Sequence, residues 1–406
     1  MILIFLLGGT QLAQAAVIDI PPSPTSMTST TKRMISYRNQ KHSWQTSDGA
    51  LHIMVNVGTV PNSQALTLYS SFDNGVTYTP EFTLPKTNGF STSDGILGNA
   101  VANSNVLQIV YGTESNDPEI MYVTAAYDST TQTWTLGTPQ LVYAAKGQLS
   151  SMPAFNVDSA GNLWVCYTVE VIATGLYSLQ MSYQLANTST WVQSGLTFGV
   201  TDNIAQHAGR PVPLPNGIGM VFQDDTTLYW SYWLNSQPLN APWATQVLYT
   251  GLPPAGNDPY GTHFNVAADA GNNLFLIFAE NTGALGYLMY SNTTGTWGNV
   301  QNLTSTSYVV TYMQVVIADG DVVLIANDKT SLVVFQSTDG GATFKLTQVL
   351  THTPATGTDL DYNNPRVEAP TYCTSPIPTW QQFFDPTTQY LNFYSVPVLV
   401  AGSDTR

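Results

Sequence analysis

Short apolar runs alternate with polar turns along most of the chain, and residues 261–297 show this pattern most clearly. Residues 263–268, 274–279 and 285–290 are rich in apolar side chains, and stretches rich in Asp, Gly, Asn, Ser and Thr separate them. Trp297 begins a fourth run after another such turn. Apolar segments of this length, bounded by turn residues, are typical of β-strands joined by tight connections. We therefore predict a four-stranded antiparallel meander here.

The same plan recurs along the chain at intervals of 47 to 57 residues. An aromatic residue marks the start of each fourth strand; these residues are Tyr78, Trp134, Trp191, Trp243, Trp297 and Phe344. A period of about fifty residues with four strands per unit is typical of a β-propeller. Six units are plain, and a weaker seventh covers residues 363–398. The prediction is an all-β fold, a single seven-bladed β-propeller of four-stranded antiparallel blades.

The seventh unit lacks a fourth strand, which must come from elsewhere for the ring to close. Residues 32–38 form a strand-like segment before the first unit. We expect this N-terminal strand to close the ring by completing blade seven, because closure removes two exposed sheet edges. The predicted organisation is a secretion signal at 1–16, a flexible leader at 17–31, the propeller at 32–400 and a tail at 401–406.

The N-terminus and the composition both favour export. Residues 2–7 are apolar, and Ala13 and Ala15 form an A-x-A-like cleavage site, although no basic residue precedes the run. A plain apolar tail is the alternative. The run is too short for a membrane span. Charged residues make up 9% of the chain, well below the roughly 25% of ordinary domains. We therefore expect a secreted, extracellular protein, and a monomer.

Charge and cysteine content limit the partners and cofactors. A net charge of −15 argues against general nucleic-acid binding, which needs phosphate contacts from basic residues. Cys166 and Cys373 fall in blades that are not neighbours, so no disulfide is expected. The sequence contains no H-E-x-x-H or other zinc motif, so no metal ligands are assigned. Acidic turns leave a structural Ca²⁺ site open, and no other cofactor is indicated.

Two turns carry a more specific motif. Residues 71–78 and 337–344 both match S-x-D-x-G-x-T-aromatic. This resembles the Asp box of the sialidase-like (BNR repeat) β-propeller superfamily. The Asp carboxylate can accept backbone N–H bonds within the turn, and Gly permits the positive φ, so the motif is structural. The resemblance implies a propeller found in sialidases, other glycosidases, polysaccharide lyases and non-enzymatic binding proteins.

Candidate functional residues gather at one end of the expected inner strands. Basic, imidazole and aromatic residues lie at or near the beginnings of first strands: His42, Arg210, His263, Arg366, His207, Trp44, Tyr260 and Tyr312. Second strands run back to the same face and are followed by Glu114, Glu170, Asp224, Asp225, Glu280 and Asp328. Strand ends that merely meet solvent are the alternative. We predict a pocket on the face where first strands begin and second strands end.

The resemblance suggests roles for these residues. Sialidases hold the substrate carboxylate with three arginines, because the guanidinium group binds a carboxylate in a bidentate manner. Arg210, Arg366 and Arg38 are the candidates here, although no strict [FY]-R-I-P motif occurs. Tyr372 is a candidate nucleophile, with a buried core tyrosine as the alternative. The remaining substrate-binding candidates are Glu170, Glu280, Trp44, Tyr260 and Tyr312.

Histidines allow a second chemistry. Propeller lyases abstract a proton beside a uronate carboxylate, with His or Tyr as base and Arg as the neutralising cation. His42, His207 and His263, with Arg210, would supply that set. Asp224 joins the catalytic candidates, since carboxylates beside imidazoles shift both pKa values.

Two functions therefore stay open, and the enzyme is the preferred one, because the basic and imidazole residues gather where catalysis would need them. One is a secreted carbohydrate-active enzyme, a sialidase-like glycoside hydrolase or polysaccharide lyase, acting on an extracellular poly- or oligosaccharide at an axial pocket. The other is a non-catalytic glycan-binding or cell-surface interaction module, favoured by the 22 Tyr and 9 Trp residues and the sparsely charged composition.

Overall fold

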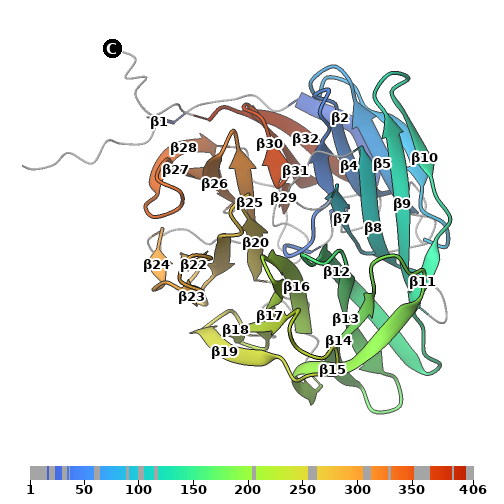
Figure 1. Cartoon of the computed structure of the whole chain (residues 1–406). Coiled ribbons are helices and arrows are strands. Elements are labelled where there is room, and N and C mark those ends of the chain that lie inside the picture. The colour runs from blue at the N-terminus through green and yellow to red at the C-terminus, as the bar shows by residue number, and fades with distance from the viewer. Residues whose placement is uncertain are drawn as a thin grey trace, which may run out of the picture.

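The computed structural model shows a ring of seven β-sheets arranged around a central axis (Figure 1). The described residues are 16–17, 23–29, 34–35, 37–58, 65–87, 91–98, 105–113, 118–203, 207–254, 263–304, 312–327, 331–351, 366–385 and 388–398. They form strands and turns without any helix. No helix in this part of the chain is therefore long and apolar enough to cross a membrane. The predicted seven-bladed all-β propeller is confirmed.

Blades one to three follow the chain in order. Blade one contains β3 (Ser43–Gln45), β4 (Leu51–Val57), β5 (Ala65–Ser71) and β6 (Thr79–Thr83). Blade two contains β7 (Ser93–Leu97), β8 (Val106–Gly112), β9 (Ile120–Asp128), β10 (Thr133–Leu136) and β11 (Gln140–Tyr143). Blade three contains β12 (Gln148–Val157), β13 (Leu163–Val171), β14 (Leu176–Gln184) and β15 (Trp191–Asp202).

Blades four to six continue the same plan. Blade four contains β16 (His207–Leu214), β17 (Gly217–Asp224), β18 (Thr227–Leu234) and β19 (Ala244–Thr250). Blade five contains β20 (Phe264–Ala268), β21 (Leu274–Ala279), β22 (Leu285–Ser291), β23 (Thr296–Trp297) and β24 (Gln301–Asn302). Blade six contains β25 (Tyr312–Ala318), β26 (Asp321–Asn327), β27 (Ser331–Ser337) and β28 (Lys345–Thr351).

Two short strands extend blade six, and blade seven draws on both ends of the chain. In blade six, β1 (Ala16–Val17) pairs in parallel with β28, and β30 (Tyr372–Cys373) pairs in parallel with β25. Blade seven has the strand order β2 (Ser23–Ser29), β32 (Thr388–Val396), β31 (Ile377–Asp385) and β29 (Arg366–Glu368). The first strand of each blade lies on the axial side of its sheet, with the short β30 beyond β25 in blade six, and Figure 1 shows several of these strands facing the axis.

The core lies between neighbouring blades, and β21 shows why. Every residue of β21 is buried, as its continuous apolar sequence predicts. Leu274, Leu276 and Phe278 pack with apolar residues of blade four. Phe275 and Ile277, which point to the opposite face, pack with apolar residues of blade six. Each sheet therefore buries both faces, and the ring holds itself together through these contacts.

An N-terminal strand closes the ring, but it is not the predicted segment. Strand β2 pairs antiparallel with β32, with Ser23 opposite Phe393. Met27 is 1% exposed and joins the core around Trp380. The prediction that residues 32–38 supply this strand is wrong. The true closing strand lies inside the stretch 17–31, for which we expected a flexible leader.

The chain beyond the closing strand enters the centre of the ring instead. Residues 37–42, here called the axial segment, are buried and hydrogen-bond to first strands of several blades. Asn39 Nδ2 donates to the Gly209 carbonyl at 2.8 Å, and Gln40 Nε2 donates to the Pro153 carbonyl at 2.7 Å. The segment therefore fills this level of the axis, which explains why it forms no strand in blade seven.

The two Asp-containing turns have matching hydrogen bonds. In the first, Thr77 donates from its backbone N–H to Asp73 Oδ1 at 2.8 Å and from its hydroxyl to Asp73 Oδ2 at 2.6 Å. Thr343 makes the same pair of bonds to Asp339, at 2.9 and 2.6 Å. Both turns lie before the outer strands of their blades, away from the axis. Their carboxylates thus act within the turn, as expected.

Candidate functional site

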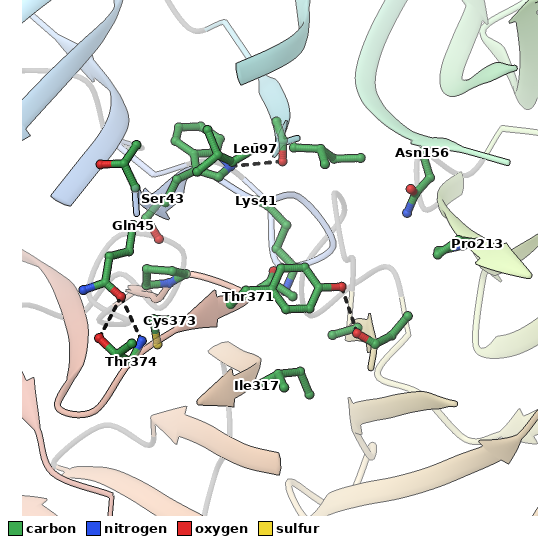
Figure 2. Close-up of a pocket in the computed structure, with 18 of the residues that line it drawn as sticks. Lys41, Ser43, Gln45, Leu97, Asn156, Pro213, Ile317, Thr371, Cys373 and Thr374 are labelled. Carbon is green, nitrogen blue, oxygen red and sulfur yellow. Dashed lines mark hydrogen bonds between the residues drawn. The ribbon is translucent and has the colours of Figure 1, made fainter. Parts of the chain in front are cut away.

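A cavity of about 380 Å³ lies at the end of the axis where the first strands finish. Its wall is formed by the last residues of β3, β7, β12, β16, β20 and β25, together with residues 370–374 (Figure 2). This is the opposite end of the axis from the predicted pocket. The position of the cavity follows from the axial segment. This segment fills the middle of the axis and closes the inner end of the cavity.

Lys41 and Arg210 lie at the inner end of the cavity. Arg210 Nη1 donates to Asp94 Oδ1 at 2.6 Å and to the Asn39 carbonyl at 2.9 Å. Lys41 Nζ donates to Asn265 Oδ1 at 2.7 Å and to a neighbouring glutamine. Burial lowers the pKa of Lys41 to about 7, the nearby Arg210 guanidinium acts in the same direction, and carboxylates of Glu368 and Asp94 oppose it. The cavity therefore ends on a cationic network that is already hydrogen-bonded.

Two aromatic residues form the walls. The Trp44 indole is 6% exposed, and its Nε1 donates to the Gly95 carbonyl at 3.3 Å. A Cβ atom at residue 95 would lie 2.2 Å from the indole Cζ2, so glycine is needed there to seat the ring. The Tyr372 hydroxyl donates to the Ala268 carbonyl at 2.8 Å. Burial raises the pKa of Tyr372, so the hydroxyl remains protonated at neutral pH.

The rim is polar and links three parts of the ring. Gln45 Oε1 accepts two hydrogen bonds from Thr374, one from the backbone N–H at 2.8 Å and one from the side-chain hydroxyl at 3.3 Å, as the dashed lines in Figure 2 show. Asp319 Oδ2 accepts from the Ser375 N–H at 2.8 Å. Among the described residues that line the cavity, Asp319 is the single carboxylate. The cavity thus combines aromatic walls, amide and hydroxyl groups, and one acid.

The structure brings three of the predicted site residues to this cavity: Arg210, Trp44 and Tyr372. A second group packs against the axial segment and its approach. Tyr312 lies beneath two guanidinium groups, with Arg38 4.2 Å and Arg366 4.6 Å from the ring centroid. His42 Nδ1 lies 3.0 Å from Glu368 Oε2. These side chains are buried within the ring and serve to hold the segment in place.

The remaining candidates lie apart from the cavity. His207 stands between two carboxylates, with Nε2 3.0 Å from Asp202 Oδ1 and Nδ1 3.4 Å from Asp224 Oδ1. Burial is the main cause of a raised pKa for Asp224. The His263 backbone N–H donates to Gln223 Oε1 at 2.8 Å.

The two glutamates predicted to bind substrate also lie away from the cavity. Glu280 accepts from the Thr282 hydroxyl at 3.2 Å, and Glu170 is partly exposed near the end of β13. Tyr260 lies outside the described residues, as do residues 305–311 and 352–365 between later blades. The predicted pocket at that end therefore stays a prediction.

Sequence reasoning missed the two carboxylates nearest the axis. Asp94 accepts from the Lys41 N–H at 2.7 Å and the Phe155 N–H at 3.0 Å besides Arg210. Glu368 accepts from the His42 N–H at 3.1 Å and the Ser43 hydroxyl at 3.3 Å. One feature of the sequence could have identified Asp94 and Glu368. Each is an acidic residue inside a first strand, where apolar residues are expected.

Comparisons with known proteins give structural matches alone. No protein-family model and no curated protein matches the chain. A Trypanosoma rangeli sialidase in complex with the inhibitor DANA aligns at 11% identity and a TM-score of 0.48, over 80% of this chain and 57% of that one. This chain therefore spans little more than half the length of that sialidase.

Two further solved structures align over most of their own length. A Penicillium chrysogenum α-L-arabinanase complexed with arabinobiose aligns at 12% identity and a TM-score of 0.47, over 93% and 99% of the two chains. An Aleuria aurantia lectin in complex with Fucα1-6GlcNAc aligns at 13% and 0.47, over 83% and 100%. Matches at this level are not evidence of function, which must be argued from the cavity.

Proposed function

We propose that the protein is a non-catalytic carbohydrate-binding propeller whose cavity takes a short segment of an extracellular glycan. The observation that carries this proposal is the cavity itself, at about 380 Å³, with the Trp44 indole and Tyr372 on its walls. Small-molecule sites typically span roughly 300–1,000 Å³ and combine apolar walls with a few oriented polar groups. Sugar rings present apolar faces to aromatic side chains and hydroxyls to amides such as Asn156.

The chemistry of the lining favours binding over turnover. Glycoside hydrolysis ordinarily requires two carboxyl groups flanking the bond. Among the described residues lining the cavity Asp319 is the single acid, and the Ser375 N–H donates to it. A lyase needs a base with a pKa near the working pH. The raised pKa of Tyr372 makes its hydroxyl a poor base. Burial lowers the pKa of Lys41 to about 7, but its amine is already bound to Asn265 Oδ1 at 2.7 Å and Gln314 Oε1 at 3.1 Å, which occupies it at the closed inner end.

A carbohydrate-active enzyme acting at the same cavity is the second candidate. Arg210 and Tyr372, predicted as a carboxylate ligand and a nucleophile, both line it, and the Asp-box-like turns favour a sialidase-like superfamily. Arg210 already binds the Asp94 carboxylate at 2.6 Å. A substrate carboxylate would have to compete with this buried ion pair, and separating such a pair is costly.

Binding and turnover are separable by experiment. The protein is screened on a panel of neutral and acidic oligosaccharides, and every ligand that binds is then incubated with protein and analysed for cleavage by mass spectrometry. We expect micromolar to millimolar binding of a saccharide without product. Cleavage at a rate that depends on Arg210 would establish the enzyme, and a panel without any ligand would refute both candidates.

Two variants locate the binding. Gly95→Ala forces the indole of Trp44 to move and should weaken binding on the order of tenfold, since an aromatic contact is worth roughly 0.5–1.5 kcal/mol beyond its buried area. Gly298→Ala is the matched control, because a Cβ there would have its nearest neighbour at 3.6 Å. Equal affinity of both variants would place the sugar elsewhere.

A further inference from the structure

A second cluster of functional groups lies where blades three and four meet. His207 begins β16, Asp224 ends β17 directly opposite it in the antiparallel register, and Asp202 ends β15. One donor atom from each of the three side chains lies within 4.8 Å of the other two. This cluster is independent of the cavity and of the function proposed for it.

The hydrogen bonds of His207 leave one nitrogen facing an acid. Nε2 lies 3.0 Å from Asp202 Oδ1, and we assign the ring proton to Nε2 because a carboxylate can only accept. Nδ1 then presents its lone pair to Asp224 Oδ1, 3.4 Å away. Both of these atoms are buried and neither has a hydrogen-bond partner, with His207 0% and Asp224 7% exposed. The other Asp224 oxygen accepts from the Val200 N–H at 2.9 Å, which fixes the carboxylate.

Two buried electron-pair donors that face each other across such a gap need a cation between them. Leaving buried polar atoms without a partner costs free energy, and most for a charged group. A shared proton would draw the atoms to roughly 2.7–2.9 Å with good alignment. The observed 3.4 Å instead matches the separation of about 3.3 Å expected between two ligand atoms around a tetrahedral ion with bonds of about 2.0–2.1 Å.

We propose that His207 Nδ1 and Asp224 Oδ1 bind one Zn²⁺ ion, with Asp202 orienting the imidazole. An imidazole nitrogen combined with a carboxylate oxygen suits a borderline transition-metal ion better than Ca²⁺ or Mg²⁺, which take oxygen ligands. A metal-bound histidine usually donates its other N–H to a carboxylate, which fixes the tautomer and ring direction, and Asp202 is placed to do this.

The site would join two blades. Asp202 ends the outer strand of blade three, and His207 and Asp224 belong to the inner strands of blade four. An ion held here binds the folded ring and not the unfolded chain. Zn²⁺ should therefore raise the melting temperature in a concentration-dependent way.

Calorimetric titration of ZnCl₂ into the EDTA-treated, dialysed full chain tests the proposal. We expect one site per chain. The affinity for Zn²⁺ should fall by about 100-fold or more in Asp224→Asn and in His207→Gln. Asp202→Asn, which affects ring orientation alone, should weaken binding by roughly 10- to 100-fold. His52→Gln is the control, because it removes a buried imidazole whose nitrogens already contact Thr46 and Ser70 hydroxyls.

The outcomes are decisive in both directions. Circular dichroism shows whether each variant is folded. If His207→Gln does not fold, the near-isosteric Asp224→Asn alone tests whether the cluster binds Zn²⁺. A wild-type chain that binds no Zn²⁺, or an Asp224→Asn variant that binds as wild type does, overturns the proposal. Tighter binding of CaCl₂ than of ZnCl₂ would also overturn it, since that preference belongs to an all-oxygen site.

Discussion

At the scale of single residues, Lys41 is the cation near the axis whose pKa departs most from its ordinary value. Burial moves its pKa from 10.5 to about 7. The folded protein therefore releases this proton at a pH where the unfolded chain still holds it. Between about pH 7 and 10.5 the unfolded state binds more protons, so the contribution of Lys41 to stability rises with pH.

Lys41 should therefore make the stability of the protein rise between neutral and alkaline pH. Urea unfolding of the wild type and of Lys41→Met is measured at neutral pH and at about pH 9.5. The wild type should gain stability relative to the variant as the pH rises, because the variant lacks the titrating amine. A difference that is independent of pH would show that Lys41 keeps an ordinary pKa.

At this scale the sequence points to individual residues near the axis but not to their ion-pair partners. Arg210, Trp44 and Tyr372 were recognised as unusual residues, and all three line the cavity. Asp94 and Glu368 were missed, although they bind Arg210 and His42. Such ion pairs join residues far apart in the chain, and no local pattern records which acid meets which base.

At the scale of strands and turns, β2 shows tertiary contacts overriding local propensity. Its sequence is rich in Ser, Thr and Pro, which are poor signals for a strand, whereas residues 32–38 look strand-like. Pairing with β32 and burial of Met27 decide the outcome. The axial segment is needed at the centre of the ring, where its polar side chains meet first strands.

The contribution of β2 can be measured through one side chain. Met27→Ala should destabilise the fold by about 2–4 kcal/mol, because it leaves a cavity in the core between blades seven and one. Thr28→Ala, at the exposed neighbour, should stay within about 0.5 kcal/mol. Chemical unfolding of both variants provides the comparison. Equal effects would mean that β2 does not anchor the ring.

The two Asp-containing turns predict an acid response. Hydrogen bonds from Thr77 hold the pKa of Asp73 at about 2, and those from Thr343 do the same for Asp339. The unfolded value is 3.8, so their stabilising effect is full above that pH and is lost as the pH falls toward about 2. Asp339→Asn should lessen the fall in melting temperature between about pH 4 and 2, with Asp73 still contributing its share, and should leave saccharide affinity unchanged. An unchanged acid profile would contradict this role.

At the scale of the whole molecule, the ring was predictable and the placement of its cavity was not. Alternating apolar runs and aromatic anchors repeat locally, so the number and order of blades follow from the sequence. Which end of the axis is hollow depends on the axial segment, whose contacts reach residues up to 326 positions away. The cavity consequently lies where the first strands end.

The central claim is that a saccharide binds at this end of the axis. It is tested by calorimetric titration of the tightest panel ligand into the wild type, Trp44→Ala and Glu280→Gln. Trp44 lines the cavity, whereas Glu280 represents the opposite face predicted from sequence. We predict that Trp44→Ala weakens binding by about tenfold or more and that Glu280→Gln stays within about twofold. Loss of binding in Glu280→Gln with unchanged affinity in Trp44→Ala would contradict the account.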